Sequence, residues 1–367
     1  MIGVVGLGTM GLGIAQVYAA SGQDVLLTDR DDAARGAAAG RIGDSLTKRV
    51  DRGRMSAEER EAILGRLRVV DGTEAMARCA MVVEAIVERI EAKQDLFSAL
   101  EAVIAGDAVL ATNTSSLSVG KIAEGLDRPE RLVGLHFFNP APAMKLVEIV
   151  AHDGTDAAVS TRARDLTEAA GKTVVQAPDS PGFIVNRCAR PFYGEALAML
   201  EEGRSAAEID AALVADGYRI GPFALIDLIG ADINLAASEG VATAMNGHPR
   251  YHVFDTLRRQ VASGDLGRKT GAGFVTGRAE APGDAGAVQL RMAAVLANEA
   301  ASLLGDVDEG GIDTAMRLGL NFPRGPLEGA RATGLGRIRD ELRRLDGVAP
   351  PHLAGRYAIV PELEAMR

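Results

Sequence analysis

The chain of 367 residues lacks most features of secreted, membrane and nucleic-acid-binding proteins. It has two cysteines, Cys79 and Cys188, which argues against a disulfide scaffold and favours a reducing compartment. We find no basic leader at its start and no run of the roughly 18 apolar residues that span a membrane. The formal net charge of −10 repels nucleic acid and anionic lipid. We therefore expect a cytoplasmic protein with no nucleic-acid or membrane partner.

What the sequence does contain is the composition of a multidomain globular protein and a glycine motif at its start. Apolar residues make up 47% and charged residues 25%, and the length exceeds what one core usually holds. The stretch "IGVVGLGTMGLGIAQV" places Gly6, Gly8 and Gly11 in GxGxxG spacing between a β-rich run and a helical one. A second apolar run, "DVLLTD", ends on Asp29.

This order of strand, glycine turn, helix, strand and acid predicts a dinucleotide site. Gly6 would make the tight turn, Gly8 would let the backbone approach a pyrophosphate, and Gly11 would let helix and strand pack closely. Asp29 would hold the adenosine ribose and repel a 2′-phosphate, which selects NAD over NADP.

Further apolar runs stop abruptly at polar residues. Residues 80–88 ("AMVVEAIVE") and 108–117 ("AVLATNTSSL") alternate with helical segments, which is typical of a parallel, doubly wound sheet. Ligands of such sheets collect at the carboxyl ends of the strands. The polar residues expected at those ends are Glu88, Asn113, Ser115 and His136.

Two ionisable groups stand inside apolar runs of the segment "GLHFFNPAPAMKLVEIV". His136 lies between apolar neighbours, and Glu148 follows twelve residues later. Burying either group alone is costly, so each needs a partner or a purpose. A satisfied core histidine and an edge-strand glutamate would also explain the pattern.

Seven motifs in order resemble those of the L-3-hydroxyacyl-CoA dehydrogenases, most closely the bacterial 3-hydroxybutyryl-CoA dehydrogenase type. The resemblance covers residues 1 to about 277. The motifs are "GLGTMGLGIAQ", "VVEAIVE", "TNTSSLSV", "GLHFFNPAPAMKLVEIV", "DSPGFIVNR", "GPFALIDLIGAD" and "GRKTGAGF".

The resemblance implies a role for each site residue. His136 would be the general base, held by Glu148, while Ser115 and Asn186 would bond the substrate oxygens near the reacting carbon. The implied substrate-binding residues are Ser45 and Arg52 for CoA, together with Ser115 and Asn186. The implied NAD-binding residues are Gly6, Leu7, Gly8, Thr9, Met10, Gly11, Asp29, Glu88, Lys93, Ser115, Asn139 and Lys269. No metal site is expected.

The CoA assignment has a basis in the local pattern of charge. Ser45, Lys48, Arg49 and Arg52 share one face of an expected helix, which could receive a CoA phosphate. A solvated helix face explains the same charges. A carrier-protein phosphopantetheine would also fit.

A repeat lies in the second half of the chain. Residues 195–230 echo residues 299–334 at an offset of about 104, and "TGRAEAPGDAGAV" between the copies has the composition of a linker. Where Asn186 should recur stands Leu290. We therefore expect an α/β Rossmann-type NAD-binding domain followed by two all-α dehydrogenase C-terminal-type domains. Their expected ranges are 1–180, 181–277 and 288–367, with a linker at 278–287.

Single-copy members of the family resemble one another in dimerising through the helical domain. The second copy should therefore dock on the first as an internal pseudo-dimer. The intact chain would then be a monomer, or would associate through another surface.

These observations predict NAD-dependent, reversible oxidation of an L-3-hydroxyacyl-CoA to the 3-oxoacyl-CoA, on 3-hydroxybutyryl-CoA or a related short or medium acyl thioester. One alternative on the same fold is a gulonate-like sugar-acid dehydrogenase that uses no CoA. An alternative of another class is a non-catalytic NAD-binding structural protein. The intact set of Ser115, His136, Glu148 and Asn186 argues against the last.

Overall fold

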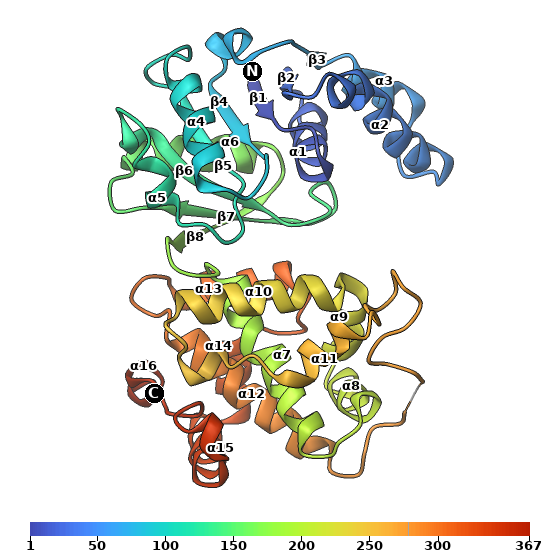
Figure 1. The fold of residues 1–367 in the computed structure, drawn as a ribbon, viewed down its shortest axis with the longest axis vertical. Coiled ribbons are helices and arrows are strands. Elements are labelled where there is room, and N and C mark those ends of the chain that lie inside the picture. Colours follow the sequence, from blue (N-terminus) through green and yellow to red (C-terminus); the bar gives the residue numbers. More distant parts are fainter. Residues whose placement is uncertain (278) are drawn as a thin grey trace. The chain divides into compact units, whose positions relative to one another are not determined.

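The computed structural model describes residues 1–277 and 279–367, and it divides into two compact units (Figure 1). Unit 1 comprises Met1–Ser180 and unit 2 comprises Pro181–Arg367. No helix within the described ranges combines the length and the apolarity that crossing a bilayer requires. The expected linker at 278–287 begins at Arg278, which lies outside the described residues.

In the described part of unit 1, eight strands form one sheet in the order β3-β2-β1-β4-β5-β6-β7-β8. The strands are β1 (Ile2–Val5), β2 (Val25–Thr28), β3 (Leu67–Val69), β4 (Met81–Glu84), β5 (Val109–Thr112), β6 (Leu132–Phe137), β7 (Leu146–Ala151) and β8 (Thr173–Pro178). Strands β1 to β6 run parallel, as expected, whereas β7 pairs antiparallel with β6 and parallel with β8. The predicted parallel sheet is confirmed over β1 to β6, and the antiparallel pair at one edge arises because the short connection 138–145 turns the chain back beside β6.

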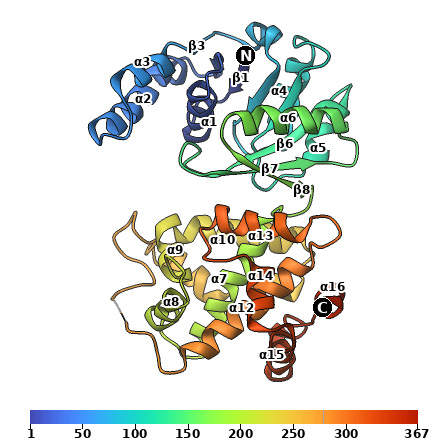
Figure 2. The same ribbon diagram turned by 180° about the vertical axis from the view of Figure 1, so that it is seen from behind.

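Helices cover both faces of this sheet. They are α1 (Thr9–Ala20), α2 (Asp32–Asp51), α3 (Ala57–Leu64), α4 (Ile90–Glu101), α5 (Val119–Ala123) and α6 (Ala157–Ala169), with 3₁₀ turns η1 (Thr73–Arg78) and η2 (Pro129–Arg131). Helix α4 lies in front of the strands in Figure 1 and α6 in Figure 2, which is seen from behind. The central strands are buried on both sides, which explains why their sequences are continuous apolar runs.

Helices α2 and α3 pack on each other and extend from the β2–β3 side of the sheet (Figures 1 and 2). Asp31 caps α2 by accepting a hydrogen bond from the Ala33 N–H. A capping box formed by Ser56 and Glu59 starts α3. Local chemistry thus fixes where both helices begin.

The regular elements among the described residues of unit 2 are all helices. Its helices are α7 (Val185–Glu201), α8 (Ala206–Ala215), α9 (Pro222–Ile229), α10 (Ala231–Ala244), α11 (Asp255–Ala262), α12 (Ala285–Ala301), α13 (Glu309–Gly319), α14 (Pro326–Thr333), α15 (Leu335–Val348) and α16 (Pro361–Ala365), with 3₁₀ turns η3 (Pro249–Tyr251) and η4 (Pro351–Leu353). Helices α7 and α12 lie side by side in its interior (Figures 1 and 2). The two expected helical domains are thus parts of one compact unit.

The sequence repeat reappears as repeated hydrogen bonding. Asp210 on α8 accepts bonds from the first N–H groups of α9, those of Phe223 and Ala224, at 3.0 and 2.8 Å. Asp313 on α13 accepts the equivalent bonds from Leu327 and Glu328 on α14 at 2.9 and 2.8 Å. Helices α7 to α10 therefore correspond to α12 to α15.

A buried glutamate on each of the central helices α7 and α12 makes an equivalent set of contacts with the other repeat. Glu299 on α12 binds the Arg187 Nε at 2.7 Å and the Tyr251 hydroxyl at 2.7 Å, and Arg250 lies 3.3 Å from its other oxygen. Glu195 on α7 makes the matching contacts with Arg291, Tyr357 and Arg356 at 2.6, 3.0 and 3.2 Å. Both carboxylates are fully buried. Such reciprocity is the signature of an isologous interface, here formed within one chain.

Replacing Glu299 by alanine should destabilise the protein strongly, because Arg187 and Arg250 would remain as buried cations without their carboxylate. We expect the free energy of unfolding to fall by about 3–5 kcal/mol in urea denaturation. Glu239→Ala is the control, since Glu239 and its partner Arg258 are each 47% exposed. That variant should lose less than about 1 kcal/mol. Equal losses in the two variants would contradict this account.

Candidate functional site

The glycine motif forms a tight turn between β1 and α1. Gly6 has φ +97°, and a Cβ on Gly11 would lie 1.7 Å from the Gly6 carbonyl oxygen. A Cβ on Gly8 would meet no atom within 4 Å, so the space beside its backbone is open. Leu7 lies in the turn, while Thr9 and Met10 begin α1. The N–H groups at the amino terminus of α1 can therefore bind an anion. The glycines let the anion come close to them, because no side chain is in the way.

Asp29 follows β2 and faces this turn. Its carboxylate accepts hydrogen bonds from the N–H groups of Leu7 at 2.7 Å and Asp31 at 3.0 Å. A cavity of about 490 Å³ borders Gly6, Gly8 and Asp29. An open glycine turn beside a positioned carboxylate fits the pyrophosphate and adenosine ribose of NAD.

His136 and Glu148 are direct cross-strand partners on β6 and β7. The imidazole Nδ1 lies 2.7 Å from Glu148 Oε2, and the two side chains are 6% and 0% exposed. Each group therefore compensates for the burial of the other, as the sequence analysis required. The antiparallel pairing gives Glu148 its place opposite the histidine.

Glu88 organises the loop that follows β5. One of its oxygens accepts bonds from the Thr114 hydroxyl at 2.6 Å and the Ser115 N–H at 2.9 Å. Asn113 joins the same loop to β6 by accepting from the Phe137 N–H at 2.9 Å. Burial acts to raise the pKa of Glu88, but the charge of Lys93 and these hydrogen bonds outweigh it and lower the pKa. Glu88 is therefore an anion that fixes the Ser115 backbone.

Lys93 lies beneath this loop, and its side chain is 1% exposed. Its ammonium group is 2.6 Å from Glu84 and 3.2 Å from Glu88. Glu84, at the end of β4, also accepts from the Thr112 hydroxyl at 2.7 Å. Glu84 was not predicted from the sequence, although in "MVVE" it is an ionisable residue of an apolar strand, as His136 and Glu148 are.

Three other predicted residues of unit 1 are exposed. Asn139 follows β6 just before Pro140. Ser45 lies on α2, and Arg52 caps the carboxyl end of that helix. The α2–α3 pair thus presents the expected basic face to solvent.

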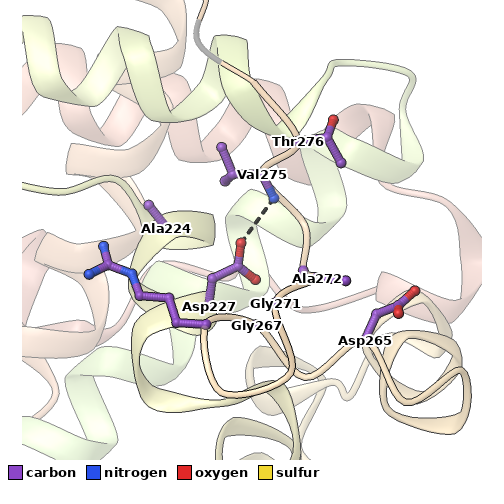
Figure 3. Close-up of a pocket in the computed structure, with 10 residues that line it drawn as sticks. Ala224, Asp227, Asp265, Gly267, Gly271, Ala272, Val275 and Thr276 are labelled. Carbon is purple, nitrogen blue, oxygen red and sulfur yellow. Dashed lines mark hydrogen bonds between the residues drawn. The ribbon is translucent and has the colours of Figure 1, made fainter.

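Asn186 and Lys269 belong to unit 2. Asn186 stands in the first turn of α7, and Lys269 forms an ion pair of 2.5 Å with Asp232 at the start of α10. The segment that carries Lys269 folds around Asp227, whose carboxylate accepts from the Phe274 N–H at 2.9 Å and from the Val275 N–H at 3.0 Å. Figure 3 shows the second of these bonds. Asp227 therefore fixes the loop that follows α11.

A glycine turn with the carboxylate of Asp29 beside it, in the same unit as a buried histidine–glutamate pair, is the arrangement of an oxidoreductase that uses NAD as its cofactor. Comparisons with known proteins narrow this class. The family described as "3-hydroxyacyl-CoA dehydrogenase, NAD binding domain" matches residues 1–180, and "3-hydroxyacyl-CoA dehydrogenase, C-terminal domain" matches residues 182–277. The chain belongs to the 3-hydroxyacyl-CoA dehydrogenase family.

Individual relatives agree with this placement. The chain is 44% identical to the 3-hydroxyadipyl-CoA dehydrogenase of Escherichia coli K12 over 281 residues, 76% of this chain and 59% of that one. It is 37% identical to the 3-hydroxybutyryl-CoA dehydrogenase of Clostridioides difficile over 74% of this chain and 98% of that one. The crystal structure of 3-hydroxybutyryl-CoA dehydrogenase from Escherichia coli K12 covers 99% of this chain and 97% of its own, with 33% identity and a TM-score of 0.91.

Replacing Asp29 by alanine should relax the preference for NAD over NADP, because the charge that repels a 2′-phosphate is lost. The ratio of kcat/KM values for the two cofactors should fall by about 10-fold or more, as expected for a charge-assisted hydrogen bond. Asp24→Ala, in the exposed loop before β2, is the matched control and should leave the ratio unchanged. An unchanged ratio in Asp29→Ala would rule out this role.

Proposed function

We propose that the protein oxidises an L-3-hydroxyacyl-CoA to the 3-oxoacyl-CoA with NAD, reversibly, on 3-hydroxybutyryl-CoA or a related short or medium acyl thioester. The observation that carries the proposal is the buried contact of 2.7 Å between His136 and Glu148. The names of the relatives support the substrate class.

Oxidation of a secondary alcohol removes a proton from the hydroxyl and a hydride from its carbon. NAD, when bound, accepts the hydride. His136 removes the proton through Nε2, since Nδ1 faces Glu148. The Glu148 carboxylate fixes the tautomer and stabilises the imidazolium that forms. In the reverse direction the same imidazolium returns the proton to the 3-oxo oxygen.

The other site residues bind and orient in this proposal. Ser115 and Asn186 hydrogen-bond the substrate oxygens, and Ser45 and Arg52 receive CoA phosphates. Glu88, Asn139 and Lys269 line the nicotinamide side. Lys93 acts through Glu88, because its ammonium group is buried between Glu84 and Glu88.

Acetoacetyl-CoA with NADH, followed by nicotinamide absorbance, tests the activity. His136→Ala should lower kcat by about 10²–10⁴-fold, because it removes the general base and acid. The affinity for NADH, measured by fluorescence titration, should change little. His152→Ala is the control, since that ring bonds the Pro129 carbonyl and has no proposed catalytic role. Near-normal turnover in His136→Ala would contradict the mechanism.

We also propose that α12 to α16 are a second, degenerate C-terminal-type repeat, docked on α7 to α11 as a pseudo-dimer. The reciprocal contacts of Glu195 and Glu299 support this reading. In single-copy relatives the same α7 face would be open to a second subunit. The intact chain is then a monomer, or associates through another surface.

A chain that ends after residue 277 should expose this face and deprive Glu195 of its three buried partners. We expect the shortened chain to dimerise or aggregate, because the uncovered surface is apolar around a buried carboxylate. Light scattering on the shortened and intact chains measures the difference. A shortened chain that stays monomeric and soluble would refute the pseudo-dimer.

A further inference from the structure

Arg190 is a buried cation on α7, one turn beyond Asn186. Its side chain donates from Nε to the Asn186 carbonyl at 3.0 Å and from Nη1 to the Ser238 hydroxyl at 3.0 Å. A longer contact of 3.4 Å reaches the Asn234 carbonyl. All three acceptors are uncharged, and the residue is 8% exposed.

This guanidinium has no carboxylate partner among residues 1–277 and 279–367, and its Nη2 meets no acceptor there. The Tyr193 ring lies 5.2 Å from its central carbon. Burial lowers the pKa of Arg190, as expected for a cation without a counter-ion. By contrast, Arg187, Arg250, Arg291 and Arg356, at the α7–α12 contact, are each paired with Glu195 or Glu299. The charge of Arg190 is therefore balanced by no carboxylate in the described part of the chain.

The neighbouring Asn234 also has unused hydrogen-bonding capacity. It is 2% exposed, and its Oδ1 is buried without a partner in the described part of the chain. Rotation of the amide by 180° exchanges its oxygen and nitrogen, so the same group can present an N–H donor. The Arg190 guanidinium, which lacks a carboxylate partner, and the Asn234 amide, whose Oδ1 lacks a hydrogen-bond partner in the described part of the chain, thus lie together between α7 and α10.

In the second repeat, the equivalent contact between α12 and α15 shows which side chains are sufficient for packing. At the offset of 104, Arg190, Asn234 and Ser238 correspond to Ala294, Ile338 and Leu342 on α12 and α15, and Asn186 to Leu290. Ala294, Ile338 and Leu342 are fully buried, so the equivalent crossing packs with apolar side chains. The polar group occurs only in the repeat that carries Asn186. The polar group thus adjoins Asn186, the residue that the proposed function assigns to the substrate.

We propose that Arg190, with Asn234 and Ser238, binds a carboxylate at the far end of the acyl chain, so that the preferred substrates are 3-hydroxyacyl-CoA thioesters of dicarboxylic acids. This inference rests on the proposed function, in which Asn186 contacts the substrate near its reacting carbon. The relative from Escherichia coli that is 44% identical is named for such a substrate, 3-hydroxyadipyl-CoA.

The spacing on α7 suits a short dicarboxylic chain. Residues four apart on a helix are about 6 Å apart along its axis. In a six-carbon chain three C–C bonds separate C3 from the terminal carboxyl carbon, about 4 Å at ~1.5 Å per bond with angles included. A long arginine side chain covers the remaining distance.

The experiment compares 3-hydroxyadipyl-CoA with 3-hydroxyhexanoyl-CoA, which has the same chain length and a methyl group in place of the carboxylate. We expect the wild-type enzyme with NAD to favour the dicarboxylic substrate in kcat/KM. In Arg190→Gln the ratio of the two kcat/KM values should fall by about 10- to 150-fold, the range for a hydrogen bond to a charged group.

Arg131→Gln is the matched control, because Arg131 is likewise buried and bonds the carbonyls of Ala108 and Ala105, at the end of β6 remote from His136. It should leave the ratio unchanged. If Arg190→Gln fails to fold, the variants Asn234→Ala and Ser238→Ala test the inference instead. Each should lower the ratio of kcat/KM for the dicarboxylic substrate to that for the hexanoyl substrate, by a smaller factor than Arg190→Gln.

Two results would overturn the inference alone: a wild-type enzyme that favours the hexanoyl substrate, or variants at 190, 234 and 238 that lower both kcat/KM values equally. The second result would assign Arg190 to positioning Asn186. A wild-type enzyme inactive on both substrates and on acetoacetyl-CoA would instead contradict the proposed function itself.

Discussion

The antiparallel pairing of β6 with β7 is the constraint on which the rest of the site depends. It sets His136 opposite Glu148, and a slip of one residue would bring Val147 or Ile149 there and leave the carboxylate facing the other side of the sheet. Neither ionisable group is tolerable in this core without the other. The register that packs the sheet is therefore also the register that pairs His136 with Glu148.

Paired buried charges also fix the loop beside this pair. Glu84 holds Lys93 in the interior, Lys93 holds Glu88, and Glu88 holds the backbone of Ser115. Glu84 and Lys93 are both buried, and each is costly to bury alone but acceptable in contact with the other. The loop after β5 thus has one arrangement in which every charge is satisfied, which gives Ser115 a defined position although its side chain is exposed.

The sequence predicted what short-range chemistry determines. The glycine turn and Asp29 follow from residue types at fixed spacing, and the burial of His136 pointed to Glu148 because both interrupt apolar runs. The reversal of β7, the burial of Lys93 and the partners of Glu195 could not be predicted, because they depend on which distant segments pack together. The echo at an offset of 104 indicated the repeat, but not that α7 and α12 exchange reciprocal ion pairs.

Comparison of the two repeats distinguishes the residues of α7 that pack against α12 from the polar residues of α7 that do not. On α7, Arg187 and Glu195 contact α12, whereas Arg190 contacts α10. At 100° per residue, Arg190 lies about 40° from Asn186 around α7, whereas Arg187 lies about 100° and Glu195 about 180° from it, so Asn186 and Arg190 lie on a face that adjoins the one with Arg187 and Glu195. On α12 the packing face recurs as Arg291 and Glu299, but the first face has become Leu290 and Ala294. A helix needs only the packing face to hold the unit together, so the polar face of α7 is where the substrate specificity of this chain should reside.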